Sequence, residues 1–333
     1  MKNELNYIDL FSGAGGMSLG FDEAGFKNIF AIDIEPSFCK TYKANFPFHN
    51  LIEKDISKIS NEEILLLAIN KEIDVIIGGP PCQGFSMAGN IGRKFIEDSR
   101  NQLFKEFARV VEVIRPKYFV MENVARLFTH NKGETKKQII DLFNKIGYFV
   151  DCEVLNTVNF GAPQIRNRVL FIGNRISNKI IFPSIINQKQ ISIQDAIGKL
   201  PKLKSGEVSC MPNHIAMKHS TQMLEKMKFV TDGGNRSEMP EHIRPQTGDV
   251  RKYIRYKSTK PAVCVTGDMR KIFHYEQNRA LTVRELATLQ TFPLDFIFKG
   301  STISQQQQVG NAVPPIFAKE VALALKEMIN NDK

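Results

Sequence analysis

Features that would place the chain in a membrane or in an oxidising compartment are missing from its sequence. No apolar run approaches the ~18 residues that a membrane helix needs. The start, MKNELNYIDLF, has an early acidic residue and no separate apolar segment typical of a secretory signal. The cysteines, at positions 39, 82, 152, 210 and 264, are odd in number and form no CxxC pair. We therefore expect a cytoplasmic protein with free thiols, no disulfide framework and no membrane association.

One short segment carries side chains that could suggest a bound metal. Cys210, His214 and His219 lie close together in the sequence, but no fourth ligand for tetrahedral zinc is in sight. We therefore favour a solvated loop and expect no metal.

Positive charge is unevenly distributed along the 333 residues. The net charge is +10, and residues 199–275 hold 15 lysines and arginines against seven acidic side chains. In an isolated segment such an excess is usually a solvated surface. Beside a candidate active site it favours a polyanionic partner, with nucleic acid as the first candidate.

The first half of the chain alternates short apolar runs with stretches of helical spacing. We expect strands over 7–11, 29–33, 75–79, 118–123 and 168–173, and helices over 61–71, 101–114 and 135–147. Such alternation predicts an α/β fold: an open, mostly parallel sheet with helices on both faces.

The pattern decays from residue 176 to about residue 275. Pro, Gly, Ser, Asn and Lys cluster there, and no helix longer than the one around 221–229 is expected, which predicts a smaller, loop-rich domain. A helix over 280–292 should follow, with Thr282 as N-cap and Glu285 completing a capping box. A C-terminal helix is expected over 314–330.

A glycine loop follows the first expected strand in IDLFSGAGGMSLGF. Gly13 and Gly15 fit a dinucleotide-binding GxGxxG fingerprint, but its third place holds Ser18. Asp33 ends the second expected strand and suits ribose hydroxyls. Asp55 ends an expected third strand segment and could accept from an adenine amino group. Each acid alone is more often a cap or a surface charge. Together with the loop they favour an adenosine cofactor without a pyrophosphate requirement.

A single cysteine is presented by rigid backbone in DVIIGGPPCQGFS. The buried strand around Ile76 must end abruptly at the two glycines and two prolines that precede Cys82. A structural cysteine needs only an apolar pocket, whereas a nucleophile needs a fixed position, access and no competing disulfide. Cys82 is therefore the candidate nucleophile.

These segments belong to an ordered set of motifs. The set comprises DLFSGAGG, GGPPCQGFS, ENV (122–124), QIRNR (164–168), LTVRELATLQTFP (281–293) and QVGNAVPP (308–315). In this the sequence resembles the DNA cytosine methyltransferases that modify carbon 5, of the bacterial restriction–modification type. The resemblance spans nearly the whole chain, except for about 176–262.

The resemblance implies a Rossmann-like S-adenosylmethionine-dependent methyltransferase fold with a mixed sheet and a target-recognition domain. The catalytic and cofactor-binding domain would be 1–175, the target-recognition domain 176–275, and 276–333 would return to the catalytic domain. The methyl donor would be S-adenosylmethionine, leaving S-adenosylhomocysteine. Asp33 would bind its ribose, and Ile34, where relatives often have an aromatic residue, would pack on adenine. The other implied contacts are Phe11, Ser12, Gly13, Ala14, Gly16, Asp55, Ile56, Pro80, Leu103, Asn311 and Val313.

The resemblance also implies the chemistry. Cys82 would add to carbon 6 of cytosine, and Glu122 would hydrogen-bond the ring nitrogen and the exocyclic amine. Arg166 and Arg168, expected at alternating positions on one face of a strand, would fix the base and orient Glu122.

Double-stranded DNA is the implied substrate. The base would be flipped out of the duplex, and residues 87–100 would form a loop that closes over it. The basic domain would read the duplex in the major groove, with Arg236, Arg251 and Arg255 as candidates for base or phosphate contacts.

Other functions remain open at this point. A nicotinamide dehydrogenase is disfavoured by Ser18 and by the lack of an obvious proton-relay histidine. The same chemistry on structured RNA is an alternative, although the Cys-Phe-Thr signature of that branch is missing. A non-catalytic DNA-binding relative is disfavoured because Cys82, Glu122 and Arg168 are all present. We expect a monomer associated with the nucleoid, and a partner endonuclease acting on the same site is a candidate partner.

Overall fold

The computed structural model describes residues 4–81, 102–186, 189–246 and 252–332. The chain divides into two compact units: Met1–Asn156, Asn167–Ser184 and Phe317–Lys333 form the first, and Thr157–Arg166 and Ile185–Ile316 the second. The functional division at residues 175 and 275 stays a prediction.

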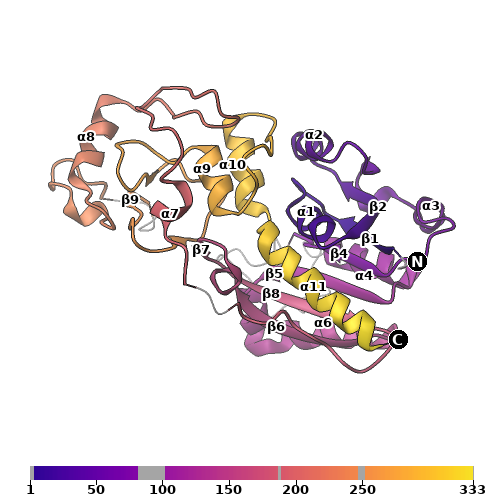
Figure 1. Ribbon diagram of the computed structural model, residues 1–333. Helices are drawn as coiled ribbons and strands as arrows, with labels where there is room; N and C mark the ends of the chain where they lie inside the picture. Colours follow the sequence, from indigo (N-terminus) through magenta and orange to yellow (C-terminus); the bar gives the residue numbers. More distant parts are fainter. Residues whose placement is uncertain (1–3, 82–101, 187–188, 247–251, 333) are drawn as a thin grey trace. The chain divides into compact units, whose positions relative to one another are not determined.

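A seven-stranded mixed sheet forms the centre of the first unit (Figure 1). The first five strands in its order β3-β2-β1-β4-β5-β8-β6 are parallel, and β8 runs antiparallel to both β5 and β6. The strands are β1 Leu5–Leu10, β2 Phe26–Asp33, β3 Leu51–Glu53, β4 Val75–Gly78, β5 Tyr118–Val124, β6 Phe149–Asn156 and β8 Asn167–Asn174.

Helices connect these strands, as the alternating sequence pattern predicts. They are α1 Gly16–Glu23, α2 Pro36–Asn45, α3 Asn61–Leu67, α4 Gln102–Ile114, α5 Arg126–Thr129, α6 Glu134–Lys145 and α11 Pro315–Asn331, with 3-10 turns η1 Ile56–Lys58 and η5 His130–Gly133. Each of the predicted strands and helices of this unit is confirmed within a few residues. The polar helix α2 and the half-exposed edge strand β6 were not predicted, because neither carries a strong apolar period.

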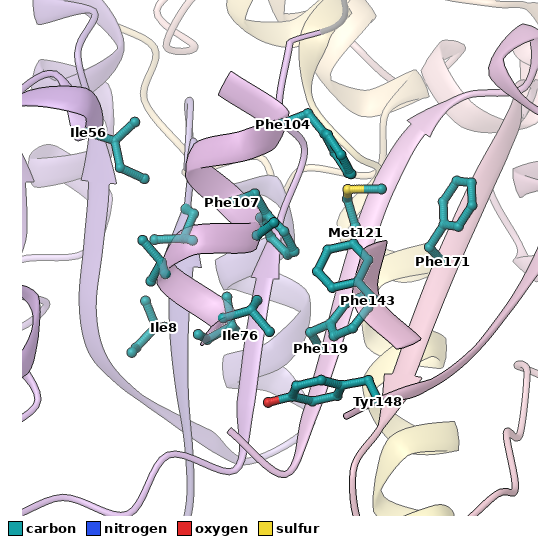
Figure 2. Packing of buried hydrophobic residues seen from close by; sticks show 14 of the residues in the cluster. Ile8, Ile56, Ile76, Phe104, Phe107, Phe119, Met121, Phe143, Tyr148 and Phe171 are labelled. Atoms are coloured by element: carbon teal, nitrogen blue, oxygen red, sulfur yellow. The ribbon is translucent and has the colours of Figure 1, made fainter. Parts of the chain in front are cut away.

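The two faces of the sheet differ in chemistry. On one face, residues of alternate strand positions such as Ile8 and Phe119 pack with Phe107 of α4 and Phe143 of α6 in one apolar cluster (Figure 2). The intervening positions point to the other face. There α1 packs on β1 through Tyr7 and Phe21, with ring centroids 5.5 Å apart.

That second face is also covered by the C-terminal helix. Lys326 of α11 donates to the Ala24 carbonyl that ends α1. At the end of α11, the Asp332 carboxylate accepts from Tyr118 on β5 at 2.7 Å and from Asn174 on β8 at 2.9 Å. Helices therefore lie on both faces, and the predicted fold class is confirmed.

Regular structure is sparse in the second unit. Its two strand pairs, β7 with β10 and β9 with β11, are two residues long and parallel. Thr282 caps α9, and the predicted capping box with Glu285 is confirmed. The elements are η6 Thr157–Phe160, β7 Gln164–Ile165, α7 Ile193–Ile197, α8 Thr221–Phe229, η7 Arg236–Glu238, β9 Ile254–Arg255, β10 Ala262–Val263, β11 Ile272–Phe273, α9 Val283–Leu289 and α10 Thr302–Asn311.

Buried arginines hold the loops of this unit together. Arg284 donates to the carbonyls of Pro212, Pro293 and Phe296. Arg279 pairs with the buried carboxylate of Glu285. Because each guanidinium offers five donors in a fixed plane, one side chain can satisfy carbonyls from several segments that no sheet pairs.

Arg255 uses all of its hydrogen-bond donors within this unit. All five of its N–H donors are occupied, by the carbonyls of Val230, Met227, His274 and Gln277 and by the side-chain oxygen of Asn278. Burial lowers the pKa of this arginine, an effect that the charges of Asp232 and Glu238 oppose. Its five hydrogen-bond acceptors are all neutral oxygens.

No helix in the described ranges is both long enough and apolar enough to cross a bilayer.

We expect Arg255→Met to destabilise the protein by at least about 3 kcal/mol, because it leaves several buried carbonyls without a donor. Arg270→Met is the matched control: Arg270 is half-exposed and pairs with Asp268 at the surface, so its loss should cost no more than about 1 kcal/mol. Urea unfolding measures both. Equal effects would contradict the role given to Arg255.

Candidate active site

The glycine loop between β1 and α1 has an unusual backbone. Phe11, Gly13 and Gly15 have φ values of 61°, 58° and 94°, a left-handed region that glycine adopts at little cost but phenylalanine does not. The Ser12 amide donates to the Ile32 carbonyl at 3.0 Å, which fastens the loop to β2. Backbone strain of this kind is typical of a ligand-binding turn.

Asp33 supports the loop from the end of β2. Its Oδ2 accepts from the Gly13 amide and its Oδ1 from the Glu35 amide, both at 2.8 Å. Burial raises the pKa of Asp33, while the backbone hydrogen bonds oppose that rise. Each oxygen keeps a second lone pair, so the carboxylate can still accept from a ligand. Ile34 beside it is 61% exposed.

Asp55 is placed differently from the prediction that it ends a strand. β3 already ends at Glu53, and Asp55 instead caps η1, where its Oδ1 accepts from the amide and the hydroxyl of Ser57 at 3.0 and 2.7 Å. These hydrogen bonds lower the pKa of Asp55. Ile56 turns into the apolar core.

The loop also contains a buried polar atom whose partner is missing from the described part of the chain. The Ser12 hydroxyl is buried and makes no hydrogen bond there. Buried polar atoms are rarely unsatisfied in folded proteins. Together with the Asp33 carboxylate and the buried Ala14 and Gly16 of the loop, this donor and acceptor set fits a ligand that carries hydroxyl groups, such as an adenosine.

Glu122 and Arg168 form the polar centre of the sheet's second face. Glu122 lies opposite Leu170 and Arg168 opposite Val124 in the β5–β8 register, so the two are diagonal neighbours on one face. Arg168 Nε lies 2.7 Å from Glu122 Oε1, but the N–H does not point at this oxygen well enough for a hydrogen bond. Oε1 therefore keeps its capacity to accept one.

Glu122 and Asn123 of β5 each approach the backbone that follows β4. A Cβ added at Gly79 would lie 3.2 Å from Glu122 Oε2, so a larger residue there would press on the carboxylate. The side-chain amide of Asn123 donates to the carbonyl of the buried Pro80 at 3.0 Å. This bond fastens the backbone two residues before Cys82. Asn123 was not predicted to have a role, although it stands inside the ENV motif.

Cys82 and the predicted closing loop at 87–100 lie outside the described residues. Leu103, just beyond them, is on α4 and packs against the apolar cluster of the first unit.

Arg166 and Arg168 were predicted to share one face of a strand. The strand is interrupted at residue 166, between β7 and β8, and the shared face stays a prediction. Arg166 lies in the second unit, where it donates to the carbonyls of Val265, Gly310 and Ala312 at 2.9, 2.9 and 3.0 Å. Its contact with the base stays a prediction.

Three of the sequence motifs meet in the second unit. The buried Gln164 of QIRNR donates to Gln290 of LTVRELATLQTFP at 2.5 Å, and Gln290 donates to the Val309 carbonyl of QVGNAVPP at 2.6 Å. Asn311 is exposed at the end of α10, and Val313 is buried just after it. These motifs therefore contribute a structural hub, which residue type alone did not reveal.

Two further expectations for the second unit are corrected. Arg255 has no donor left for DNA. The predictions for Arg236, which is partly buried in η7, and for Arg251, which lies outside the described residues, stay predictions. The segment from Cys210 to His219 is not simply a solvated loop: His214 is fully buried between Thr282 and the Pro201 carbonyl. Among the described residues no cluster of His, Cys, Asp and Glu suits a metal ion.

Comparison with known proteins adds the following similarities. A family model for C-5 cytosine-specific DNA methylases matches residues 5–327. The Type II methyltransferase M1.HphI of Haemophilus parahaemolyticus is 59% identical over 328 residues, 98% of this chain and 88% of the relative. M.DdeI of Desulfomicrobium norvegicum is 33% identical over 368 residues, 96% of this chain and 88% of the relative.

Among solved structures, a prophage-encoded E. coli protein assigned as a DNA modification methyltransferase superposes with a TM-score of 0.81 at 26% identity, covering 98% of this chain and 100% of that one. The S. pombe Dnmt2 methyltransferase shares the fold, with a TM-score of 0.67 at 17% identity, covering 98% and 100% of the two chains.

Proposed function

Because the chain belongs to the C-5 cytosine-specific DNA methylases of the restriction–modification type, we propose that it methylates a flipped-out cytosine in a specific duplex sequence through a covalent Cys82 adduct. The observation that carries this proposal is the Glu122–Arg168 pair, set at the end of β5 beside the Gly79–Pro80 backbone that leads into Cys82. The RNA alternative is not pursued, since the family model and the similar sequences are those of DNA methyltransferases.

The side chains divide the chemistry between them. The Cys82 thiolate adds to carbon 6 of cytosine, which makes carbon 5 nucleophilic. Glu122 hydrogen-bonds the ring nitrogen and the exocyclic amine, stabilising the charge that develops on the ring. Arg168 holds the Glu122 carboxylate in place without taking up Oε1 in a hydrogen bond. After methyl transfer, loss of the carbon 5 proton expels the thiolate and frees the enzyme.

S-adenosylmethionine, when bound, supplies an electrophilic methyl group on sulfur. The loop residues Phe11, Ser12, Gly13, Ala14 and Gly16 would hold it, with the Ser12 hydroxyl finding the partner that it lacks in the described chain. Asp33 would accept from the ribose hydroxyls, and the exposed Ile34 would cover the adenine. We also assign Asp55, Ile56, Pro80, Leu103, Asn311 and Val313 to this site, on the resemblance alone.

The second unit would contact the duplex. One of its surfaces gathers cations around Tyr253, whose φ is 61°: the ammonium groups of Lys226 and Lys271 lie 5.9 and 4.7 Å from its ring centroid. We propose that this Tyr253 surface binds DNA phosphates, since ammonium groups and a strained residue at one place are typical of a functional contact.

The remaining assignments follow the type II relatives. We propose a monomeric enzyme of the cytoplasm, associated with the nucleoid, that protects sites attacked by a partner endonuclease.

The nucleophile can be identified by trapping. DNA in which the target cytosine is replaced by 5-fluorocytosine should form an adduct that survives denaturing electrophoresis, because fluorine blocks the proton loss that normally releases the enzyme. The adduct should require S-adenosylmethionine and should disappear in Cys82→Ser, since a serine hydroxyl stays protonated near neutral pH. Glu122→Gln should slow its formation while DNA binding persists.

Peptide mapping of the trapped complex provides the control. An adduct on Cys39, Cys152, Cys210 or Cys264, or methylation by Cys82→Ser at near the wild-type rate, would falsify the assignment of Cys82. Methylation of adenine, or of the cytosine amino group, would remove the proposed reaction altogether.

Cofactor binding should depend on Asp33. Asp33→Asn keeps the size of the side chain but loses its charge and one acceptor, so S-adenosylhomocysteine affinity should fall about 10- to 150-fold, as expected for a hydrogen bond to a charged group. Glu62→Gln, an exposed change in the first turn of α3, is the matched control. Calorimetry that finds both variants alike would remove Asp33 from the site.

Salt dependence tests the Tyr253 surface. In the double variant Lys226→Gln, Lys271→Gln, the slope of log affinity against log salt should become shallower by about 0.9 for each lost phosphate contact. The matched control, Lys137→Gln with Lys145→Gln, changes the same charge on α6, which covers the sheet face opposite to Glu122. A slope changed equally by both pairs would place the DNA elsewhere.

A further inference from the structure

A chain of buried polar side chains lies beneath the glycine loop, outside the groups that the proposed chemistry uses. It begins at Asp9 on β1, which is 1% exposed. The Asp9 carboxyl is 2.6 Å from the Ser18 hydroxyl on α1, which is 2.8 Å from the Tyr42 hydroxyl on α2, which in turn is 2.9 Å from His49 Nδ1. Each of these distances is that of a hydrogen bond.

The far end of the chain reaches water. The side chain of His49 is 15% exposed, and its Nε2 lies 3.1 Å from the Asp22 carboxylate. Asp22 also accepts from the Tyr7 hydroxyl at 2.7 Å. A buried acid is thus connected to a partly exposed imidazole through two hydroxyl groups.

We infer that Asp9 and His49 share one proton through Ser18 and Tyr42, and that this relay positions the glycine loop. The positioning role rests on the proposed function, in which the glycine loop binds the cofactor. The shared proton does not.

Transfer of the proton along the relay conserves the number of protons. When Asp9 is protonated it donates to Ser18, Ser18 donates to Tyr42, and Tyr42 donates to an unprotonated His49 Nδ1. If each proton moves one step, the Asp9 O–H bond breaks and a His49 N–H bond forms, while both hydroxyls end with one proton as before. A neutral acid and imidazole become a carboxylate and an imidazolium, and the total charge is unchanged.

The groups that face the relay make both states accessible. Burial, with smaller contributions from Asp33 and Asp22, raises the pKa of Asp9 to about 8, which favours the neutral acid. The Asp22 carboxylate lies 3.1 Å from His49 Nε2, where it can accept an N–H of the ring. Burial raises the pKa of Tyr42 well above its ordinary value, so that hydroxyl keeps a proton to pass on.

Residues of this relay contact or adjoin the glycine loop on three sides. Asp9 stands two residues before Phe11, and Ser18 lies in the first turn of α1, directly after the loop. On the third side, His49 stacks on Phe46 with centroids 4.9 Å apart, and a Cβ at Gly15 would lie 2.3 Å from the Phe46 ring. A change in the charge of His49 or Asp9 therefore acts on the backbone that surrounds the loop, which makes both of them positioning residues.

The titration of His49, followed by NMR of its ring in the full chain, tests the shared proton. Sites that share a proton titrate as a pair in two steps, so wild-type His49 should show two steps. Asp9→Asn cannot ionise and should leave one step. Tyr42→Phe keeps the ring but removes the linking hydroxyl, and should also leave one step. Ser18→Ala cuts the same chain elsewhere if Tyr42→Phe fails to fold.

Either of two results would overturn the relay: a single step in the wild type identical to that of Asp9→Asn, or two steps that persist in both Tyr42→Phe and Ser18→Ala. Because no cofactor is present, neither result bears on the proposed function. The positioning effect is read separately, from S-adenosylhomocysteine affinity at pH 6.5 and pH 8.5.

Loss of the shared proton at the higher pH leaves Asp9 ionised near Asp33. Wild-type affinity should therefore fall as pH rises, by about fivefold or more, the lower range for coupled sites. Asp9→Asn should show no such fall, and its comparison with the wild type cancels the titration of the ligand itself. A parallel fall in both proteins would disprove the positioning role, whereas no binding to the wild type at either pH would instead disprove the proposed cofactor.

Discussion

The parallel pairing of β1 with β2 and of β4 with β1 and β5 is the constraint on which the candidate site depends. In this register Ile32, Leu10, Gly78 and Met121 lie in one row across four strands. The residues that follow them along the chain are Asp33, Phe11, Gly79 and Glu122, of which Phe11 and Gly79 lie just beyond their strands. The proposed ribose acceptor, the glycine loop, the backbone that precedes the proposed nucleophile and the proposed catalytic carboxylate therefore begin at the same level of the sheet, where the carboxyl ends of parallel strands leave an edge for ligands.

Such close assembly requires small residues at particular places. A Cβ at Gly78 would lie 2.4 Å from the Leu10 carbonyl oxygen, so only glycine lets β4 approach β1 there. The constraint at Gly79 is weaker, because a Cβ there would lie 3.2 Å from the Glu122 side-chain oxygen Oε2. The second unit solves a different problem, because its described strand pairs are only two residues long and most of its carbonyls lie outside a sheet. Buried guanidinium groups satisfy those carbonyls instead, at the cost of desolvating charge.

Sequence reasoning succeeded where local periodicity or local hydrogen bonds decide the structure. The strands and helices of the first unit follow their apolar spacing, and the Thr282–Glu285 capping box needs only residues three apart. It failed where the structure depends on backbone groups that are distant in the sequence. The break at Arg166, the donors of Arg255 and the bond from Asn123 to Pro80 all depend on which carbonyls the fold brings near, and residue types alone do not encode that. The resemblance identified the motifs, but it could not show that Gln164 and Gln290 within them have a structural role rather than a chemical one.

Ser18 shows how a departure from a sequence fingerprint can have a structural cause. Its replacement of the third glycine argued against a dinucleotide site, since that glycine normally allows close packing of helix and strand. In the structure Ser18 is fully buried and donates to Asp9. A glycine there would leave a buried carboxyl without this partner, which is costly in a site remote from water. The buried Asp9 carboxyl thus helps to shape the glycine loop. Ser18, which departs from the glycine fingerprint, is the residue that hydrogen-bonds this carboxyl.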